Sequence, residues 1–174
     1  RNARAEAGRL GLLDGPRHAI VGTVPAQHMY GFESTVLLAM HGNSPSWSGK
    51  PFYPQDIVRA LLAVPPPRLL VTTPFHLGTL LAAVVELPVV DRLLSATAPL
   101  SRQLAADAES RLAAPLHEIY GCTETGQLAS RRLITDPAWL PLDGVCLERE
   151  ADKVIASGGH IEGRVVLGDD LQLL

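Results

Sequence analysis

Strand-like and helix-like segments alternate along roughly the first 130 residues, and this alternation limits the possible folds more than any other feature. Short apolar, strand-like runs lie at 18–24, 68–73, 91–96 and 116–120. After about residue 130 the helical signal ends, and shorter strand-like runs follow at 145–148, 153–157, 164–167 and 171–174. Alternation of this kind predicts an α/β fold, a mostly parallel sheet flanked by helices. We expect residues 1–132 to form that unit and 133–174 to begin a small antiparallel β appendage at the C-terminal end.

The helix expected at 29–40 carries one charged side chain. Helical periodicity places Phe32, Val36, Leu37 and Met40 on one face. Glu33 lies within this apolar helix, where its carboxylate could satisfy a buried backbone group. The sequence assigns it no other role.

Two further helices have recognisable starts. Pro54 opens a helix that turns Ile57, Leu61 and Leu62 inward. Ser101 can cap the helix that follows it, and Asp107 and Arg111 are spaced for an ion pair four residues apart.

Composition excludes several classes of protein. Hydrophobic residues make up 47% of the chain and charged residues 19%, which indicates a compact globule, and a net charge of −3 gives no basic surface for nucleic acid. Cys122 and Cys146 have neither metal-ligand spacing nor the number needed for a disulfide scaffold, so a reduced, cytoplasmic setting is expected. The apolar stretch 77–90 is too short to span a membrane.

The most informative segment is Tyr120-Gly-Cys-Thr-Glu-Thr-Gly126, directly after a predicted strand. In open parallel sheets, ligands bind beyond the carboxyl ends of the strands. The two glycines allow a sharp turn and a close ligand, the threonines offer hydroxyls to phosphate, Glu124 offers a hard oxygen ligand to Mg²⁺, and Tyr120 could stack on a planar base. A purely structural turn would use the glycines and threonines without Glu124, and at this point both interpretations stay open.

This segment resembles the Tyr-Gly-x-Thr-Glu signature of the adenylate-forming (AMP-binding) superfamily, which includes acyl-CoA synthetases, aryl-acid ligases, peptide-synthetase adenylation domains and luciferases. Residues 24–33 (Val-Pro-Ala-Gln-His-Met-Tyr-Gly-Phe-Glu) look like the family's Pro-x-x-His-x-x-Gly stretch. Residues 95–100 (Ser-Ala-Thr-Ala-Pro-Leu) look like its small-residue strand end, usually Gly-Gly-Ala-Pro-Leu. The three segments agree with the family in order and spacing across most of the chain.

The resemblance implies a nucleotide site. Tyr120 would stack against adenine. The wall between adenine and the acyl group would be formed by Ala96, Thr97, Ala98 and Pro99. Asp169 matches the ribose-binding aspartate, with Asp170 as the second choice.

It also implies a catalytic and acyl site. Thr123 would bond the α-phosphate and Glu124 would hold Mg²⁺. His28 would lie at the mouth of the acyl pocket, near the substrate carboxylate, although it could instead simply cap its helix. Gly121 and Cys122 would line the pocket.

The implied activity is that of an ATP-dependent ligase. An aryl or fatty acid would form an acyl-adenylate, and the thiol of CoA, or the phosphopantetheine of an acyl carrier protein, would then form a thioester. The family's phosphate-binding loop and C-terminal lid with its catalytic lysine do not occur in the 174 residues, so we expect a piece of a longer protein that is inactive by itself.

Two alternatives remain beside this hypothesis. A non-catalytic homologue of the same fold could bind a nucleotide or acyl ligand through the same turn. A flavodoxin-like binding module would require the three motif matches to be accidental.

Overall fold

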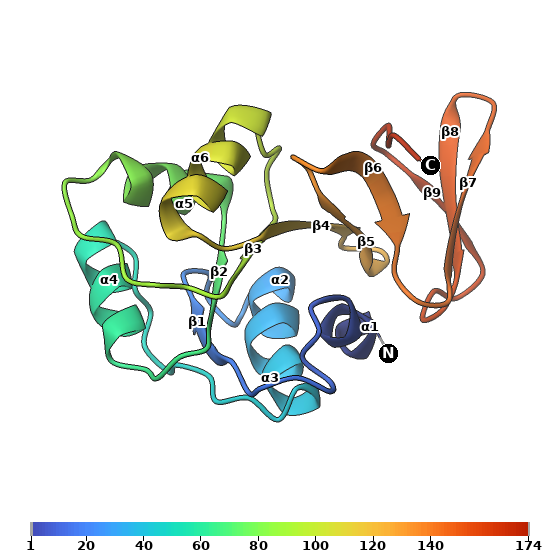
Figure 1. Ribbon diagram of the computed structural model, residues 1–174. Coiled ribbons are helices and arrows are strands. Elements are labelled where there is room, and N and C mark those ends of the chain that lie inside the picture. Colours follow the sequence, from blue (N-terminus) through green and yellow to red (C-terminus); the bar gives the residue numbers. More distant parts are fainter. Residues whose placement is uncertain (1, 174) are drawn as a thin grey trace.

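The computed structural model describes residues 2–173 and contains two sheets (Figure 1). The larger has the strand order β1 (Ala19–Gly22), β2 (Arg68–Thr72), β3 (Arg92–Ser95), β4 (Leu116–Cys122), β5 (Gly126–Arg132) and β6 (Asp136–Pro141). The smaller consists of β7 (Val145–Glu150), β8 (Lys153–Gly158) and β9 (Arg164–Leu167). The helices are α1 (Asn2–Arg9), α2 (Met29–Gly31), the π-helical η1 (Phe32–Leu37), α3 (Leu38–His41), α4 (Pro54–Leu62), α5 (Pro74–Ala82) and α6 (Arg102–Leu112).

The predicted fold class is confirmed. Strands β1 to β4 pair in parallel, β5 and β6 extend the same sheet in antiparallel pairing, and β7 to β9 form a separate antiparallel sheet. The change of sheet falls between Pro141 and Val145, because β6 still pairs with β5. The division into units 1–132 and 133–174 stays a prediction.

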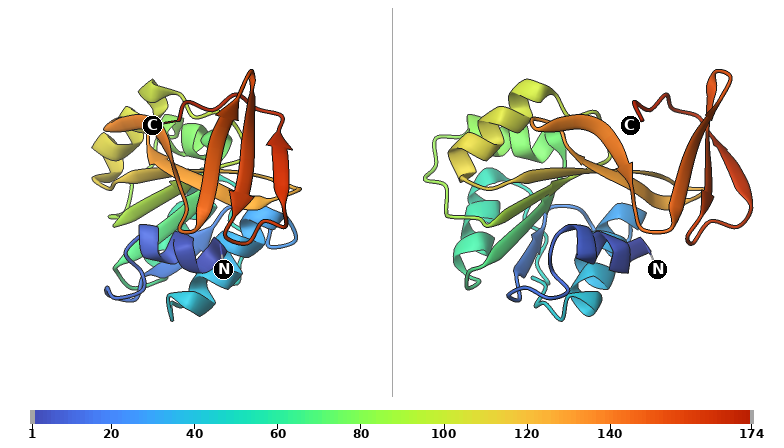
Figure 2. Two further views of the ribbon diagram at one scale, coloured as in Figure 1. Left: turned by 90° about the vertical axis from the view of Figure 1, so that its right-hand side faces the viewer. Right: turned by 45° about the vertical axis from the view of Figure 1, so that its right-hand side comes forward.

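Helices cover both faces of the parallel strands (Figure 2). Because alternate residues of a strand point to opposite faces, Leu93 packs with α4, α5 and α6, whereas its neighbour Leu94 packs with α1 and the α2–α3 segment. A third cluster joins β5 and β6 to the small sheet and to the segment after it, where Trp139 forms a bridge with Leu173. The last residue of the strand expected at 171–174 lies outside the described residues.

The helix expected at 29–40 exists, but its buried face is not the predicted one. Phe32 and Met40 are 45% and 73% exposed, whereas Glu33, Ser34 and Thr35 are buried. The middle of the segment is π-helical, so its turn is wider than the 3.6-residue turn that the prediction used. Polar residues therefore face the protein interior here, and α1 packs against them.

The features predicted for the other helices are confirmed in part. The Ser101 cap is confirmed, since its side chain accepts a 3.1 Å hydrogen bond from the Leu104 amide. Leu62 is 63% exposed and was wrongly placed inside, because Leu61 already occupies the inward position. The prediction of an ion pair between Asp107 and Arg111 is also wrong. Arg111 donates a hydrogen bond to the Leu81 carbonyl, and Asp107 accepts one from the Gln103 side chain.

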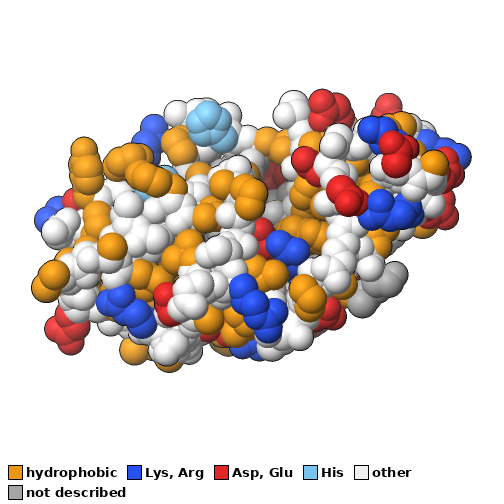
Figure 3. Space-filling model, turned by 90° about the horizontal axis from the view of Figure 1, so that it is seen from above, with side chains coloured by type: hydrophobic (Ala, Val, Ile, Leu, Met, Phe, Trp, Pro, Cys, Tyr) orange, Lys and Arg blue, Asp and Glu red, His pale blue; other side chains and the backbone are white. Residues whose placement is uncertain are grey.

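The side chains on the surface differ between the two ends of the molecule. Seen from above, charged side chains of both signs gather over the β7–β9 end, and exposed hydrophobic side chains lie over the end that holds the helices (Figure 3). Within residues 2–173, none of the helices combines the length and the apolar character needed to cross a membrane.

Candidate functional site

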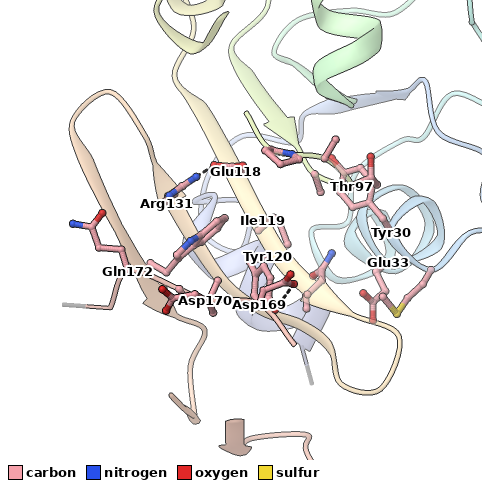
Figure 4. A pocket seen from close by; sticks show the side chains of 18 residues that line it. Tyr30, Glu33, Thr97, Glu118, Ile119, Tyr120, Arg131, Asp169, Asp170 and Gln172 are labelled. Carbon is pink, nitrogen blue, oxygen red and sulfur yellow. Dashed lines mark hydrogen bonds and ion pairs between the residues drawn. The ribbon is translucent and has the colours of Figure 1, made fainter. Parts of the chain in front are cut away.

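A cavity of about 610 Å³ opens beyond the carboxyl ends of β3 and β4, where the strand topology predicted a ligand site (Figure 4). Its walls come from α2 and η1, from the loop after β3, from β4 and β5, from Trp139 of β6, and from residues 169–172. The volume is within the range of pockets that hold small molecules.

The small-residue segment after β3 forms one wall of the cavity. Ala96, Thr97, Ala98 and Pro99 all line it, as the sequence predicted. Thr97 has a φ of 78°, a left-handed conformation that a β-branched residue rarely adopts. The family pattern has glycine at this position, so the backbone keeps a glycine-like turn although the residue is threonine. Such strain is typical of functional sites.

Tyr120 and Asp169 meet across the cavity. The Tyr120 hydroxyl donates a 2.9 Å hydrogen bond to Asp169 Oδ2, although 49 residues separate them. The Tyr120 ring also contacts Trp139, with centroids 5.6 Å apart. Burial, and then Asp169, raise the pKa of Tyr120 well above its usual value, so the phenol stays protonated and orients the aspartate. The sequence predicted both residues for one nucleotide site, and the structure brings them together.

Gly121 is required by the neighbouring strand. A Cβ atom at this position would lie 2.4 Å from the Gly126 carbonyl oxygen, closer than any side chain tolerates. The pairing of β4 and β5 is irregular between Tyr120 and Gly121. Glycine therefore allows β4 and β5 to approach closely at the cavity wall.

The two residues that the motif predicts to bind metal and phosphate lie outside the cavity lining. Thr123 and Glu124 are exposed at the turn between β4 and β5, and Cys122 Sγ lies 3.0 Å from Thr125 Oγ1. Hydrogen bonds from its own amide and from Cys122 lower the pKa of Glu124, so the carboxylate is ionised at neutral pH. The structure does not bring these side chains to Tyr120 and Asp169, and their roles stay predictions.

His28 is also exposed and outside the lining. It occupies the N-cap position of α2 but makes no capping hydrogen bond with its side chain. Its neighbours Met29 and Tyr30 do line the cavity. His28 therefore lies close to the cavity in sequence, and its role beside the substrate carboxylate stays a prediction.

An ion pair that sequence analysis did not identify forms part of the wall. Arg131 Nε donates to Glu118 Oε2 at 2.7 Å, and the guanidinium lies 4.1 Å from the Trp139 ring centroid. Burial raises the pKa of Glu118, whereas Arg131 lowers it. These residues come from three adjacent strands, so no local sequence pattern could have connected them.

A buried polar network lies beneath another part of the cavity. Gln127 Nε2 donates to Ser34 Oγ at 2.9 Å, and Ser34 Oγ donates to Glu6 Oε1 at 2.8 Å. Beside it, Glu33 accepts a hydrogen bond from the Asn2 side chain. Burial raises the pKa of Glu6 to about 8, although Ser34 and Gln127 lower it. The one sequence signal for this network was a glutamate in an apolar helix.

No family model matches the chain. A 4-coumarate–CoA ligase of Rhodobacter capsulatus is 34% identical over 140 residues, a match that covers 76% of this chain and 33% of the relative. The chain thus spans about a third of that protein's length.

Solved structures share the fold. A complex of the Bacillus subtilis o-succinylbenzoate CoA synthetase MenE superposes with a TM-score of 0.80 at 15% identity, covering 97% of this chain and 42% of that one. ATP-bound MatB from Rhodopseudomonas palustris superposes with a TM-score of 0.71 at 17% identity, covering 91% of this chain and 36% of that one. The match to the 4-coumarate–CoA ligase, together with the three motifs, shows that the chain belongs to the adenylate-forming (AMP-binding) superfamily; the solved structures share its fold, and the chain covers only part of the length of each.

Proposed function

We propose that the longer protein containing this chain is an AMP-forming acid–thiol ligase. It activates an aryl or fatty acid as an acyl-adenylate and transfers the acyl group to the thiol of CoA or of a carrier protein's phosphopantetheine. One observation carries the proposal: the strand end from Ala96 to Pro99, the Tyr120 ring and the Asp169 carboxylate line a single cavity.

The aromatic and acidic pair supports nucleotide binding. A base would stack on the Tyr120 ring, which Trp139 supports from beside it. Asp169 is positioned by the Tyr120 hydroxyl and would accept hydrogen bonds from the ribose. Such contacts fix the position of the nucleotide and leave the reacting phosphate to other groups.

The acid would lie against the segment after β3. Ala96 and Ala98 have small side chains, so the substrate can approach the backbone closely. His28 would meet the carboxylate at the mouth of the acyl pocket, near Gly121 and Cys122. In the first step the carboxylate oxygen attacks the α-phosphorus of ATP, the bond to pyrophosphate breaks, and Thr123 would donate a hydrogen bond to the α-phosphate.

Mg²⁺ fits the donors of the turn between β4 and β5. Within residues 2–173 there is no cluster of three or more His, Cys, Asp or Glu side chains that could hold a metal alone. Mg²⁺ in nucleotide enzymes needs only one or two carboxylates besides phosphate oxygens, and Glu124 is an accessible, ionised carboxylate. When bound, Mg²⁺ neutralises charge that develops on the phosphates.

The charge of the cavity supports the expectation that the isolated 174 residues are inactive. Among the described residues that line it, Arg131 is the one cation, and it is paired with Glu118. Glu33, Asp169 and Asp170 add further acidic side chains. A triphosphate needs more positive charge than this wall supplies. The same observation favours the second candidate, a non-catalytic homologue that binds a nucleotide or acyl ligand.

Pyrophosphate exchange on the full-length protein tests the proposal. With a panel of aryl and fatty acids, we expect acid-dependent exchange that Glu124→Gln reduces by at least about a hundredfold, because the metal-binding carboxylate is lost. Glu86→Gln, which changes an exposed glutamate on the loop after α5, should retain full exchange. Both variants should unfold at the wild-type temperature.

The outcomes separate the two candidates. Nucleotide binding without exchange for any acid would support the non-catalytic homologue. Rapid pyrophosphate release by the isolated 174 residues would contradict the predicted inactivity of this part. In an active full-length protein, comparing CoA with a phosphopantetheinylated carrier as acceptor identifies the thiol.

A further inference from the structure

The guanidinium of Arg131 is held by three neighbours in the cavity wall. Its Nε donates to Glu118 Oε2 at 2.7 Å, and its Nη1 donates to the Pro137 carbonyl at 3.0 Å. Its central carbon lies 4.1 Å from the centroid of the Trp139 ring. Only 16% of the Arg131 side chain is exposed. Two hydrogen bonds and an aromatic contact leave this planar group little freedom to turn toward a ligand.

Glu118 connects Arg131 to the wall segment after β3. Its other carboxylate oxygen, Oε1, accepts a 3.3 Å hydrogen bond from the Leu100 amide, directly after the segment from Ala96 to Pro99. Glu118 lines the cavity and is 4% exposed. One carboxylate therefore fixes the wall segment with one oxygen and the guanidinium with the other.

Trp139 connects Arg131 to the Tyr120 ring. The centroid of its ring lies 5.6 Å from that of Tyr120, with the two ring planes inclined at 56°. Trp139 is 7% exposed, so its neighbours determine its orientation. The Tyr120 hydroxyl in turn donates to Asp169. A series of contacts therefore runs from Glu118 through Arg131, Trp139 and Tyr120 to Asp169.

Arg131 takes part in this series without pairing with the acidic groups of residues 169–172. Figure 4 shows Arg131 beside Glu118, and Asp169 at the Tyr120 hydroxyl. Among the described residues, Arg131 forms its ion pair with Glu118, whereas Asp170 pairs with Arg149. The contacts of Arg131 thus lead to the aromatic rings.

We propose that Arg131 is a positioning residue for the nucleotide: it holds the Trp139 indole, which holds the Tyr120 ring in the orientation that stacks on the base. The inference rests on the proposed function, in which the base lies against Tyr120. It gives the one cation among the described lining residues a role in ring orientation and none in phosphate binding. Ligands with and without phosphate should therefore depend on Arg131 equally.

Adenosine, AMP and ATP test this role on the full-length protein. Arg131→Met keeps an unbranched side chain and removes the guanidinium. By isothermal titration calorimetry, we expect the Kd of all three ligands to rise by about tenfold, because each contains the base that loses its oriented ring. In pyrophosphate exchange, KM for ATP should rise by a similar factor, whereas kcat and KM for the acid should stay within about twofold.

Arg132→Met is the matched control. Arg132 is the next residue of β5 and also pairs with a glutamate, since its Nε donates to Glu109 Oε1 at 2.9 Å. It is absent from the cavity lining, because successive side chains of a strand point to opposite faces. The same change here removes a comparable ion pair and should leave the Kd of all three ligands unchanged.

Two further variants test the order of the contacts. Arg131→Lys keeps the positive charge without the planar fork, and it should also raise the Kd of adenosine, by at least about fivefold. Trp139→Leu should weaken adenosine by about as much as Arg131→Met. The double variant should lose less than about twofold more, because both changes break the same series of contacts. If Arg131→Met does not fold, Arg131→Lys and Trp139→Leu provide the test.

The failures are distinguishable. An unchanged Kd for adenosine in Arg131→Met overturns the inference and leaves the ligase function standing. A loss that is confined to ATP and restored by Arg131→Lys also overturns it, because the charge would then act on phosphate. An equal loss in Arg132→Met would show a general effect of the ion pairs and has the same consequence. If the wild type binds none of the three ligands and exchanges with no acid, the proposed function fails, and the inference with it.

Discussion

The two faces of the parallel sheet are covered in different ways. On one, the side chains that α4, α5 and α6 pack against the strands are mainly apolar, with Leu93 at 0% exposure among them, and His76 of α5 is buried beside them. On the other, α1 and the α2–α3 segment bring Glu6, Glu33 and Ser34 into the interior beside the apolar cluster. Buried carboxyl groups cost stability unless they are fully paired. The first face is therefore built for stability, and the second gives up stability next to the cavity.

The largest expected effect belongs to the apolar face. Leu93→Ala removes a fully buried side chain from the cluster under α5 and α6, and we expect the free energy of unfolding to fall by about 3 kcal/mol. Urea unfolding followed by circular dichroism measures the loss. Because the cluster is apolar, the loss should be equal in acidic and neutral buffer, and a strong pH dependence would contradict the comparison.

The second effect is a pH dependence on the polar face. Burial raises the pKa of Glu6 from 4.5 to about 8, so the unfolded chain releases this proton at lower pH than the folded protein. The stability that the neutral carboxyl provides is present below pH 4.5 and is lost as the pH rises through 8. Between about pH 5 and pH 7, wild type should lose roughly 2 kcal/mol relative to Glu6→Gln.

The comparison with Glu6→Gln is needed because another group opposes this trend. Burial lowers the pKa of His117 to about 4, so its contribution to stability is lost as the pH falls through that value. The difference between the two proteins removes the effect of His117, which both retain. Parallel pH profiles for wild type and Glu6→Gln would show that Glu6 is ionised in the folded protein.

The smallest expected effect is the difference between two serine-to-alanine substitutions, one on each face of the sheet. Ser34→Ala leaves the hydrogen-bonding atoms of Glu6 and Gln127 buried without their partner, and should cost about 2 kcal/mol. Ser101→Ala removes the exposed cap of α6 on the apolar side, and should cost about 1 kcal/mol. Thermal unfolding ranks the two, and a larger loss for Ser101→Ala would reverse the assignment of the polar network.

The side of the cavity that holds Tyr120, Asp169 and the segment after β3 could be predicted from sequence because its residues belong to short motifs or follow strand ends. Apolar runs predicted the strands, and the parallel order predicted that their carboxyl ends lie at one edge of the sheet. The family resemblance then identified Tyr120, Asp169 and the segment after β3. The structure brings these residues into one cavity.

The polar network could not be predicted, because its partners are far apart in sequence. Glu6 meets Ser34 across 28 residues, and Ser34 meets Gln127 across 93. Helix α1 is short and polar and gave no signal of its own. The 3.6-residue period also assigned the wrong inward face to the segment 29–40, since a π-helical turn does not follow that period.

That turn gives the cavity wall beside η1 a simple means of change. In a helix of 3.6 residues per turn, deletion of one residue rotates everything beyond it by about 100°. Shortening η1 by one residue would therefore rotate the segment that follows Glu33 to a new face while the sheet and the segment from Ala96 to Pro99 stay in place. Relatives that differ by a single inserted or deleted residue here would keep the sheet and present different side chains of this segment to the cavity.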